Sequence, residues 1–167
     1  MYSARAWSVR HARGLNAFYA WFESLLTRMH GLFRWLGYER AERPVAGIEK
    51  VIKGLLFDCR MCGQCVLSST GMSCPMNCPK TLRNGPCGGV RANGNCEVKP
   101  EMRCVWVEAY RGSERIPGGI EAMTKVQFAI DQRLQGRSSW LKVVREKTAA
   151  AGAQTAAAVA PSAGGRP

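Results

Sequence analysis

The sequence has no cysteine before residue 59 or after residue 104, although eight cysteines lie between these positions. Histidine is also scarce, because His11 and His30 are the two present and both precede the first cysteine. A metal site in the middle of the chain would therefore be built from thiolates rather than imidazoles. The sequence shows no nucleophile–base signature and no glycine-rich phosphate-binding loop, so we predict no catalytic residues.

The sequence also lacks an uninterrupted apolar run of the roughly 20 residues that a membrane-spanning helix needs. No clear secretory signal follows the basic N-terminal residues, because polar residues interrupt the apolar ones. We therefore expect a cytoplasmic protein and no membrane partner. In a reducing cytoplasm, a cysteine-rich segment favours bound metal over disulfide bonds. At 167 residues, the chain is also too short for a (β/α)8 barrel, which takes about 250 residues.

Acidic residues are few, since 12 Asp and Glu stand against 24 Lys and Arg, and the formal net charge is +12. Each four-thiolate metal site would carry a net charge of about −2, so two such sites would lower the total to about +8. Nucleic-acid-binding proteins usually gather basic residues on one face with aromatic residues between them. Here the basic residues scatter over predicted helices, which favours solvated surfaces or an acidic electron-donor protein over nucleic acid.

The segment from residue 59 to residue 104 contains all eight cysteines of the chain. Its cysteines are Cys59, Cys62, Cys65, Cys74, Cys78, Cys87, Cys96 and Cys104. The first three are spaced C-x2-C-x2-C, as in the bacterial ferredoxin run, and two later ones precede proline, as the fourth ferredoxin cysteine does. Eight thiolates divide evenly into two four-cysteine sites. We therefore predict that all eight bind metal, in one or two [4Fe-4S] clusters or, alternatively, as Zn2+ sites.

The grouping of the cysteines into sites is predicted in part. The C-x2-C-x2-C cysteines should share one site, because a tight loop can wrap three sulfurs around one cluster. The pair Asn93-Gly94 predicts a two-residue β-hairpin turn that pairs residues 90–92 with residues 95–97. This hairpin would return Cys96 toward Cys87, so these two should share the other site. Their order in the chain leaves three cysteines unassigned: Cys74, Cys78 and Cys104.

The same segment resembles a known family. The resemblance rests on the blocks CRMCGQCVLSSTG, CPMNCPKTLRNGPCGG, NGNCEVKPEMRCVW and the later SSW, over roughly residues 45–142. These blocks look like the C-terminal domain of methylenetetrahydrofolate reductase, which also occurs as a separate small subunit beside the flavin-bearing reductase. The resemblance implies a metal-binding, electron-relaying accessory subunit in folate one-carbon metabolism, with the flavin-containing reductase subunit as its partner.

That family has been described both as zinc-binding and as iron–sulfur, so the alternative is a zinc-stabilised interaction module of a one-carbon enzyme with no redox role. The related reductase body is a (β/α)8 barrel, which this chain is too short to form. The chain alone would therefore supply neither a flavin pocket nor a folate pocket. We expect a non-catalytic subunit of a reductase complex.

Helices are predicted on both sides of the cysteines. Apolar residues repeat every three or four positions over residues 15–36, which indicates an amphipathic helix for docking on a partner. A further helix is expected over about residues 119–135, and Ser138 or Ser139 would cap a short one. We therefore predict a small metal-stabilised α+β fold, with a cysteine-rich loop module, a short β-hairpin and flanking helices. We predict five parts. Residues 1–37 form the docking helix, residues 38–47 the linker and residues 48–110 the eight-cysteine module. Residues 111–147 form the C-terminal helices, and residues 148–167 form a disordered tail.

Overall fold

The computed structural model describes residues 2–159, with side chains up to residue 153, and its regular structure is helical. The α-helices are α1 (Tyr2–Arg10), α2 (Ala12–Arg28), α3 (His30–Leu36), α4 (Tyr38–Phe57), α5 (Val105–Ser113), α6 (Gly119–Thr124) and α7 (Ser139–Val159). Three short 3-10 helices are η1 (Leu67–Ser69), η2 (Pro75–Asn77) and η3 (Gln132–Leu134). No helix in the described part of the chain has the length and hydropathy needed to cross a bilayer.

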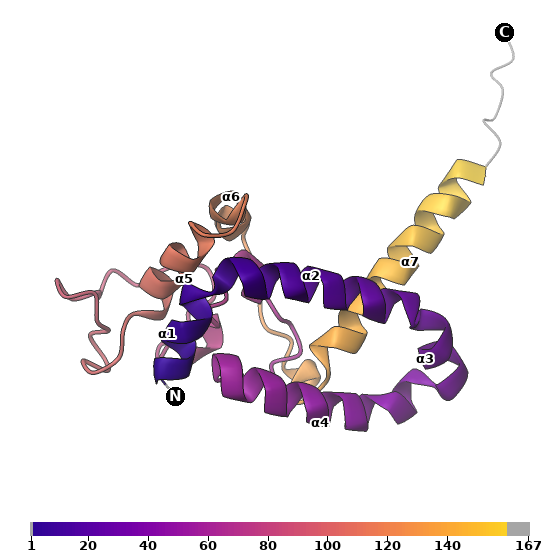
Figure 1. The fold of residues 1–167 in the computed structure, drawn as a ribbon, viewed down its shortest axis with the longest axis horizontal. Helices are drawn as coiled ribbons and strands as arrows, with labels where there is room; N and C mark the ends of the chain where they lie inside the picture. Colours follow the sequence, from indigo (N-terminus) through magenta and orange to yellow (C-terminus); the bar gives the residue numbers. More distant parts are fainter. Residues whose placement is uncertain (1, 160–167) are drawn as a thin grey trace, which may run out of the picture.

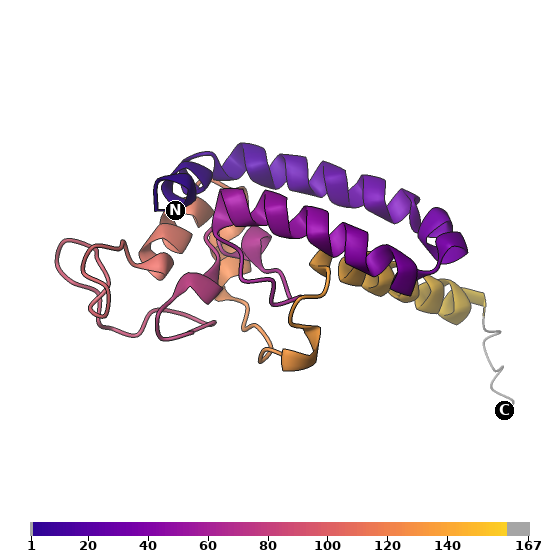
Figure 2. The same ribbon diagram turned by 90° about the horizontal axis from the view of Figure 1, so that it is seen from below.

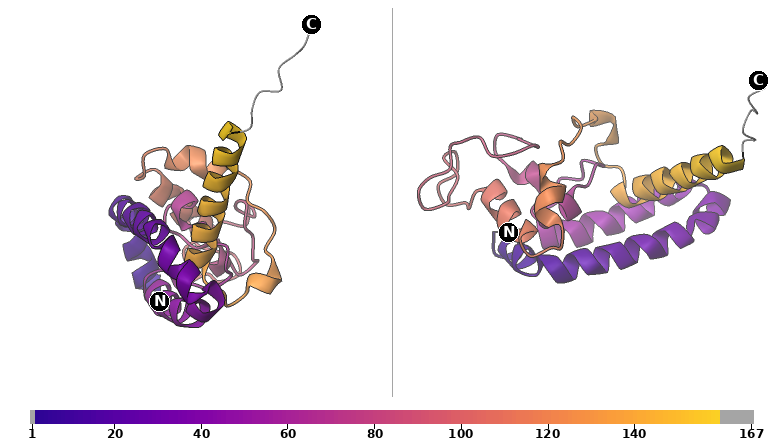
Figure 3. Two further views of the ribbon diagram at one scale, coloured as in Figure 1. Left: turned by 90° about the vertical axis from the view of Figure 1, so that its right-hand side faces the viewer. Right: turned by 90° about the horizontal axis from the view of Figure 1, so that it is seen from above.

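The molecule is elongated, with a bundle of α2, α3, α4 and α7, here called the helical end, on one side and the cysteine-bearing loops with α1, α5 and α6 on the other (Figure 1). Helices α2 and α4 run in opposite directions along its length, joined by α3, and α7 packs against all three (Figure 1). The loops between α4 and α5 lie at the end opposite α3 (Figure 2). The segment between α6 and α7 returns past these loops before α7 begins (Figure 3). The helical end therefore serves as a scaffold from which α4 leads into the first cysteine.

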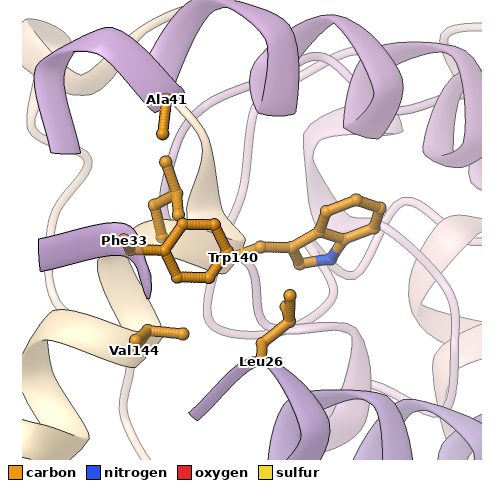
Figure 4. Packing of buried hydrophobic residues seen from close by; sticks show 6 residues of the cluster. Leu26, Phe33, Ala41, Trp140 and Val144 are labelled. Atoms are coloured by element: carbon orange, nitrogen blue, oxygen red, sulfur yellow. The ribbon is translucent and has the colours of Figure 1, made fainter. Parts of the chain in front are cut away.

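A core of apolar side chains holds the helical end together (Figure 4). Its buried members are Leu26 of α2, Phe33 of α3, Ala41 of α4, and Trp140, Leu141 and Val144 of α7. Phe22 adds an edge-to-face contact with Trp140, with ring centroids 4.9 Å apart. Burial of aromatic and aliphatic side chains of this kind is the main favourable contribution to folding.

The predicted amphipathic helix over residues 15–36 forms as α2 and α3, which are separated at Met29. One side of its apolar stripe packs on α4 and α7, where Leu26 and Phe33 are buried. The other side faces solvent, with Trp21 60% and Trp35 82% exposed. The stripe is therefore broader than the chain's own core requires, and its role in docking stays a prediction.

The predicted linker at residues 38–47 is wrong, because these residues form the first half of α4. Pro44 and Gly47 suggested a break, since proline in a helix interior removes a backbone hydrogen bond. Tertiary contacts outweigh that loss. Ala41 lies in the core, the Glu42 carboxylate accepts a hydrogen bond from the Ser138 backbone N–H, and Arg145 stacks over the Tyr38 ring at 4.6 Å.

The α+β fold class is also wrong, because no strand forms in residues 2–159 and the expected β-hairpin is absent. The turn at Gly94 does form, with φ of +82°, but the pairing around it is limited to the isolated bridges Val90–Cys96 and Asn95–Arg103. The Cys96 N–H donates instead to the Met102 carbonyl at 2.9 Å. Glycines before the turn and Pro100 after it leave too few residues for a ladder.

The C-terminal predictions hold in part. Helix α6 has 6 residues and ends at Thr124, so it is about a third as long as the helix expected over residues 119–135, and an extended segment follows it. The Asn84 amide donates to the Gln127 carbonyl at 3.0 Å, and the Gln127 N–H donates to Asn84 Oδ1 at 2.8 Å, which holds this segment outside a helix. Helix α7 starts at Ser139 as expected, but it continues to Val159 through the predicted disordered tail. Residues 160–167 lie outside the described residues.

Gly71 and Gly112 allow two backbones to touch beside the first cysteines. A Cβ at Gly112 would lie 1.9 Å from the Gly71 carbonyl oxygen, closer than any real contact. We expect Gly112→Ala to lower the free energy of unfolding by about 1–3 kcal/mol, because the two segments must separate. Urea unfolding followed by circular dichroism measures this. The control, Gly54→Ala in α4, has nothing within 4 Å and should instead stabilise by up to about 1 kcal/mol. Equal stability of Gly112→Ala and the parent chain would contradict this packing.

Candidate metal centre

Four of the eight cysteines line one pocket where α4, the first cysteine loop and the start of α7 meet. They are Cys59, Cys62, Cys65 and Cys74. The space there not filled by atoms is about 370 Å³, part of it open to solvent. The C-x2-C-x2-C cysteines thus lie together as expected. The structure adds Cys74, the first of the two cysteines that precede proline.

The backbone curls at this loop through residues in the left-handed region. Asp58 ends α4 with φ of +53°, and Met61 and Gly63 follow with φ of +50° and +70°. Left-handed residues among right-handed ones point successive N–H groups to one side, an arrangement found at anion and iron–sulfur sites. The Met61 N–H accordingly donates to Cys59 Sγ at 3.3 Å. No residue with a side chain fits at Gly63, because a Cβ there would lie 2.4 Å from the Leu134 carbonyl oxygen.

A later segment of the chain covers this loop. The Asp131 N–H donates to the Gln64 side-chain oxygen at 3.0 Å, and the Gly136 N–H donates to the Met61 carbonyl at 2.8 Å. The Gln135 amide donates to the Arg60 carbonyl at 2.8 Å. We call residues 131–136 the covering segment. These contacts hold it against the loop that carries the first cysteines.

Burial keeps two of these cysteines protonated in the absence of metal. It raises the pKa of Cys59 to about 11, although the Met61 N–H acts in the opposite direction. It raises the pKa of Cys74 to about 12, with further increases from neighbouring Cys59 and Cys65. Since thiolates are the metal-binding form, a bound cation must displace these protons and compensate the clustered negative charge.

A buried ion pair from α4 borders the same pocket. Glu49 and Lys53 are 1% and 3% exposed, and the Lys53 ammonium donates to Glu49 Oε1 and to Ser139 Oγ, both at 2.8 Å. Glu49 also accepts from the Ser138 hydroxyl at 2.6 Å. Burial alone would lower the pKa of Lys53, but Cys65 and Glu49 outweigh it and raise the pKa. Lys53 therefore stays charged next to the cysteines.

Arg83 brings a second positive charge to the pocket. Its Nη2 donates to the Gln64 carbonyl at 2.8 Å, between two of the cysteines. Its Nε and Nη1 atoms are buried and have no hydrogen-bond partner among the described residues. Buried donors of this kind nearly always have an acceptor. Thiolates and sulfides of a bound anionic cluster are acceptors that would satisfy them, so the residues present fit such a group.

The spacing of the cysteines bears on which metal fits. Zinc with bonds of about 2.3 Å would draw four sulfurs to within about 3.8 Å of one another. In residues 2–153, no three Cys, His, Asp or Glu side chains converge closely enough to hold a single ion. A four-iron cluster binds each thiolate at a different iron, so its ligands stand farther apart. Within the described residues, the four cysteines therefore line one pocket without converging on a single point.

The other four cysteines lie in the loops before α5. Cys78 packs against buried Cys96, together with Met102 and Val105. The Cys104 N–H donates to the Gly94 carbonyl at 3.0 Å. Cys87 is exposed, and its thiol lies 3.8 Å from Glu97, the residue after Cys96. The structure thus joins Cys78 to Cys96 and keeps Cys87 nearby, in a more open setting than the first group.

Sequence reasoning missed Glu49 and Lys53 at the first group, whereas Arg83 is one of the basic residues among the cysteines that it expected to offset cluster charge or to meet an electron donor. Glu49 and Lys53 stand four residues apart on α4, a spacing shared by many exposed pairs, so nothing in the sequence marks them as buried. Arg83 was one of several basic residues among the cysteines, and its position facing Gln64 depends on the fold of the loop.

Comparison with known proteins gives one match. Residues 38–133 match the family described as "Methylene-tetrahydrofolate reductase C terminal". No curated protein matches the chain, and no solved structure does. The matched region covers α4, all eight cysteines, α5, α6 and part of the covering segment.

Proposed function

Because the chain belongs to the methylene-tetrahydrofolate reductase C-terminal family, we propose that it is an iron–sulfur electron-transfer subunit of a flavin-dependent methylenetetrahydrofolate reductase. In this proposal the first group, Cys59, Cys62, Cys65 and Cys74, holds a [4Fe-4S] cluster. The observation that carries it is the pocket shared by these four cysteines, bordered by the buried Lys53 and by Arg83, whose Nε and Nη1 atoms are buried. The second group, Cys78, Cys87, Cys96 and Cys104, would hold a second metal centre.

The residues around the first group support redox rather than substrate chemistry. When bound, a cluster supplies a one-electron carrier. The chain contributes four thiolates, backbone N–H groups that face them, and the covering segment held against their loop. Arg83, which has no carboxylate partner in the described part of the chain, offsets the negative charge that reduction would add. The second group lies closer to solvent at Cys87, where Lys80 and Glu97 form a surface ion pair that an acidic electron donor could meet.

The exposed apolar residues of the helical end support a partner subunit. On α2 and α3 they include Phe18, Trp21 and Trp35, and on α4 they include Val51 and Leu55. Single exposed apolar residues are ordinary, but so many large ones on neighbouring helices are typical of interaction surfaces. The partner in this proposal is the flavin-containing reductase subunit, which would carry the folate and flavin pockets, in the cytoplasm.

Anaerobic purification of the full chain tests the proposal. We expect a brown protein that bleaches with dithionite, gives the electron paramagnetic resonance signal of a reduced four-iron cluster, and contains about four or eight irons per chain. After removal of dithionite, the reduced chain should reduce the flavin of the reductase subunit in stopped-flow mixing. Buffer taken through the same removal step without the chain should not reduce it. A colourless, ordered protein with stoichiometric zinc would contradict the proposal and establish the zinc-stabilised module instead.

A further inference from the structure

The Arg83 guanidinium is held by one hydrogen bond and has two buried donors without a partner in the described part of the chain. Its guanidinium is fixed at one corner by the 2.8 Å hydrogen bond from Nη2 to the Gln64 carbonyl. The Nε and Nη1 donors are buried beside four cysteines and lack a partner in the described part of the chain. Within the same residues, Arg83 forms no ion pair with a carboxylate. Both its charge and its free donors are therefore available to the pocket.

The other buried cation is differently placed. Lys53 gives its charge largely to Glu49, with which it forms an ion pair at 2.8 Å, and a second hydrogen bond goes to Ser139. The pair Glu49–Lys53 therefore contributes little net charge to the pocket. Arg83 supplies the uncompensated positive charge, because no carboxylate in the described residues pairs with its guanidinium.

We propose that Arg83 is the residue that raises the reduction potential of the cluster held by the first group, an inference that rests on the proposed function. Reduction transfers one electron from a low-potential donor to the cluster, breaks no bond, and changes the net charge of the four-thiolate site from −2 to −3. A nearby buried cation stabilises the more negative state more strongly. Its N–H groups, donated to thiolate or sulfide, act in the same direction.

Removal of the Arg83 charge should make the reduction potential of the first cluster more negative, because it destabilises the reduced cluster relative to the oxidised one. An exposed arginine near the same cysteines should matter much less, because water and salt screen its charge. Arg60 offers this comparison, since it is exposed and lies directly after Cys59 in the chain.

The experiment is a redox titration of the full metal-loaded chain, followed by electron paramagnetic resonance, with iron content measured for each variant. We expect Arg83→Gln to lower the equilibrium constant for reduction of the first cluster at least tenfold, which is about 59 mV for one electron. Arg83→Lys, which keeps the charge, should stay within threefold of the parent chain. Arg60→Gln should also stay within threefold. Any centre in the second group should keep its potential in all variants and serves as an internal reference.

Four outcomes separate the alternatives. Fully loaded Arg83→Gln with an unchanged potential overturns the inference and leaves the proposed function intact. Arg83→Gln could lose the first cluster while Arg83→Lys keeps it. In that case the iron content, rather than the reduction potential, shows that the site needs a positive charge at this position. If both variants lose it equally, Arg83 has a packing role and the inference fails. A parent chain that contains zinc and no iron refutes the proposed function itself.

Discussion

Replacement of Cys74 with serine should remove about four iron atoms from each chain and leave the second group loaded, because a serine hydroxyl is a poor substitute for the fourth thiolate of a cluster. Cys74 is the informative position, because its place in the first group comes from the structure rather than from the C-x2-C-x2-C spacing. Iron analysis and the electron paramagnetic resonance spectrum of the reduced protein measure the loss.

Pairs of variants make the test of grouping sharper. If Cys65 and Cys74 share a cluster, the double variant Cys65→Ser/Cys74→Ser should lose no more metal than Cys74→Ser alone. Cys78→Ser, only four residues away but packed against Cys96, should affect the second group instead. Cys74→Ser/Cys78→Ser should then lose both centres. A Cys65/Cys74 double variant that loses all its metal would show that these cysteines belong to different sites.

Glu49→Gln should lower the free energy of unfolding by about 3–5 kcal/mol, because it leaves the Lys53 ammonium buried without a counter-charge. Glu49 also accepts hydrogen bonds from both Ser138 and Ser139, so it joins α4 to the start of α7. Urea unfolding of the metal-loaded chain, at fixed metal content and pH, measures the change.

An exposed pair of the same spacing serves as the control. Lys142 and Glu146 lie four residues apart on α7, at 2.6 Å, and Glu146 is 59% exposed. Glu146→Gln should change stability by about 0.5 kcal/mol or less. The double variant Glu49→Gln/Lys53→Met should recover part of the loss, because it removes the uncompensated charge. A Glu49→Gln variant as stable as the parent chain would mean that the pair is hydrated in solution.

Local sequence patterns predicted the parts of the fold that depend on near neighbours. The C-x2-C-x2-C cysteines lie at one pocket because their spacing alone permits one tight loop. Cys74 and Cys78 both precede proline, so nothing local could assign them to different groups. The path of the chain through η1 and η2 separates them, and this path depends on the close contact between Gly71 and Gly112.

The wrong predictions came from signals that distant contacts overrule. Pro44 suggested a linker, but the core and Arg145 hold residues 38–47 in a helix. Asn93-Gly94 specified a turn, yet Cys96 pairs with Met102 rather than with a partner strand. The apolar period beyond Thr124 suggested a continued helix, whereas Val126 and Phe128 are 83% and 91% exposed on an extended segment. For residues 38–47 and for the segment after Thr124, a residue far along the chain provides the competing contact, whereas at Cys96 the competing hydrogen bond comes from Met102, six positions away.

The covering segment also bears on how the protein matures. Its contacts reach back 67 positions from Asp131 to Gln64 and 75 from Gln135 to Arg60. During synthesis at about 5–20 residues per second, the first cysteines therefore emerge several seconds before residues 131–136. An assembly factor that delivers iron and sulfide would have open access to the nascent loop in that interval. Once residues 131–136 have closed over Gly63, delivery would require this segment to open again.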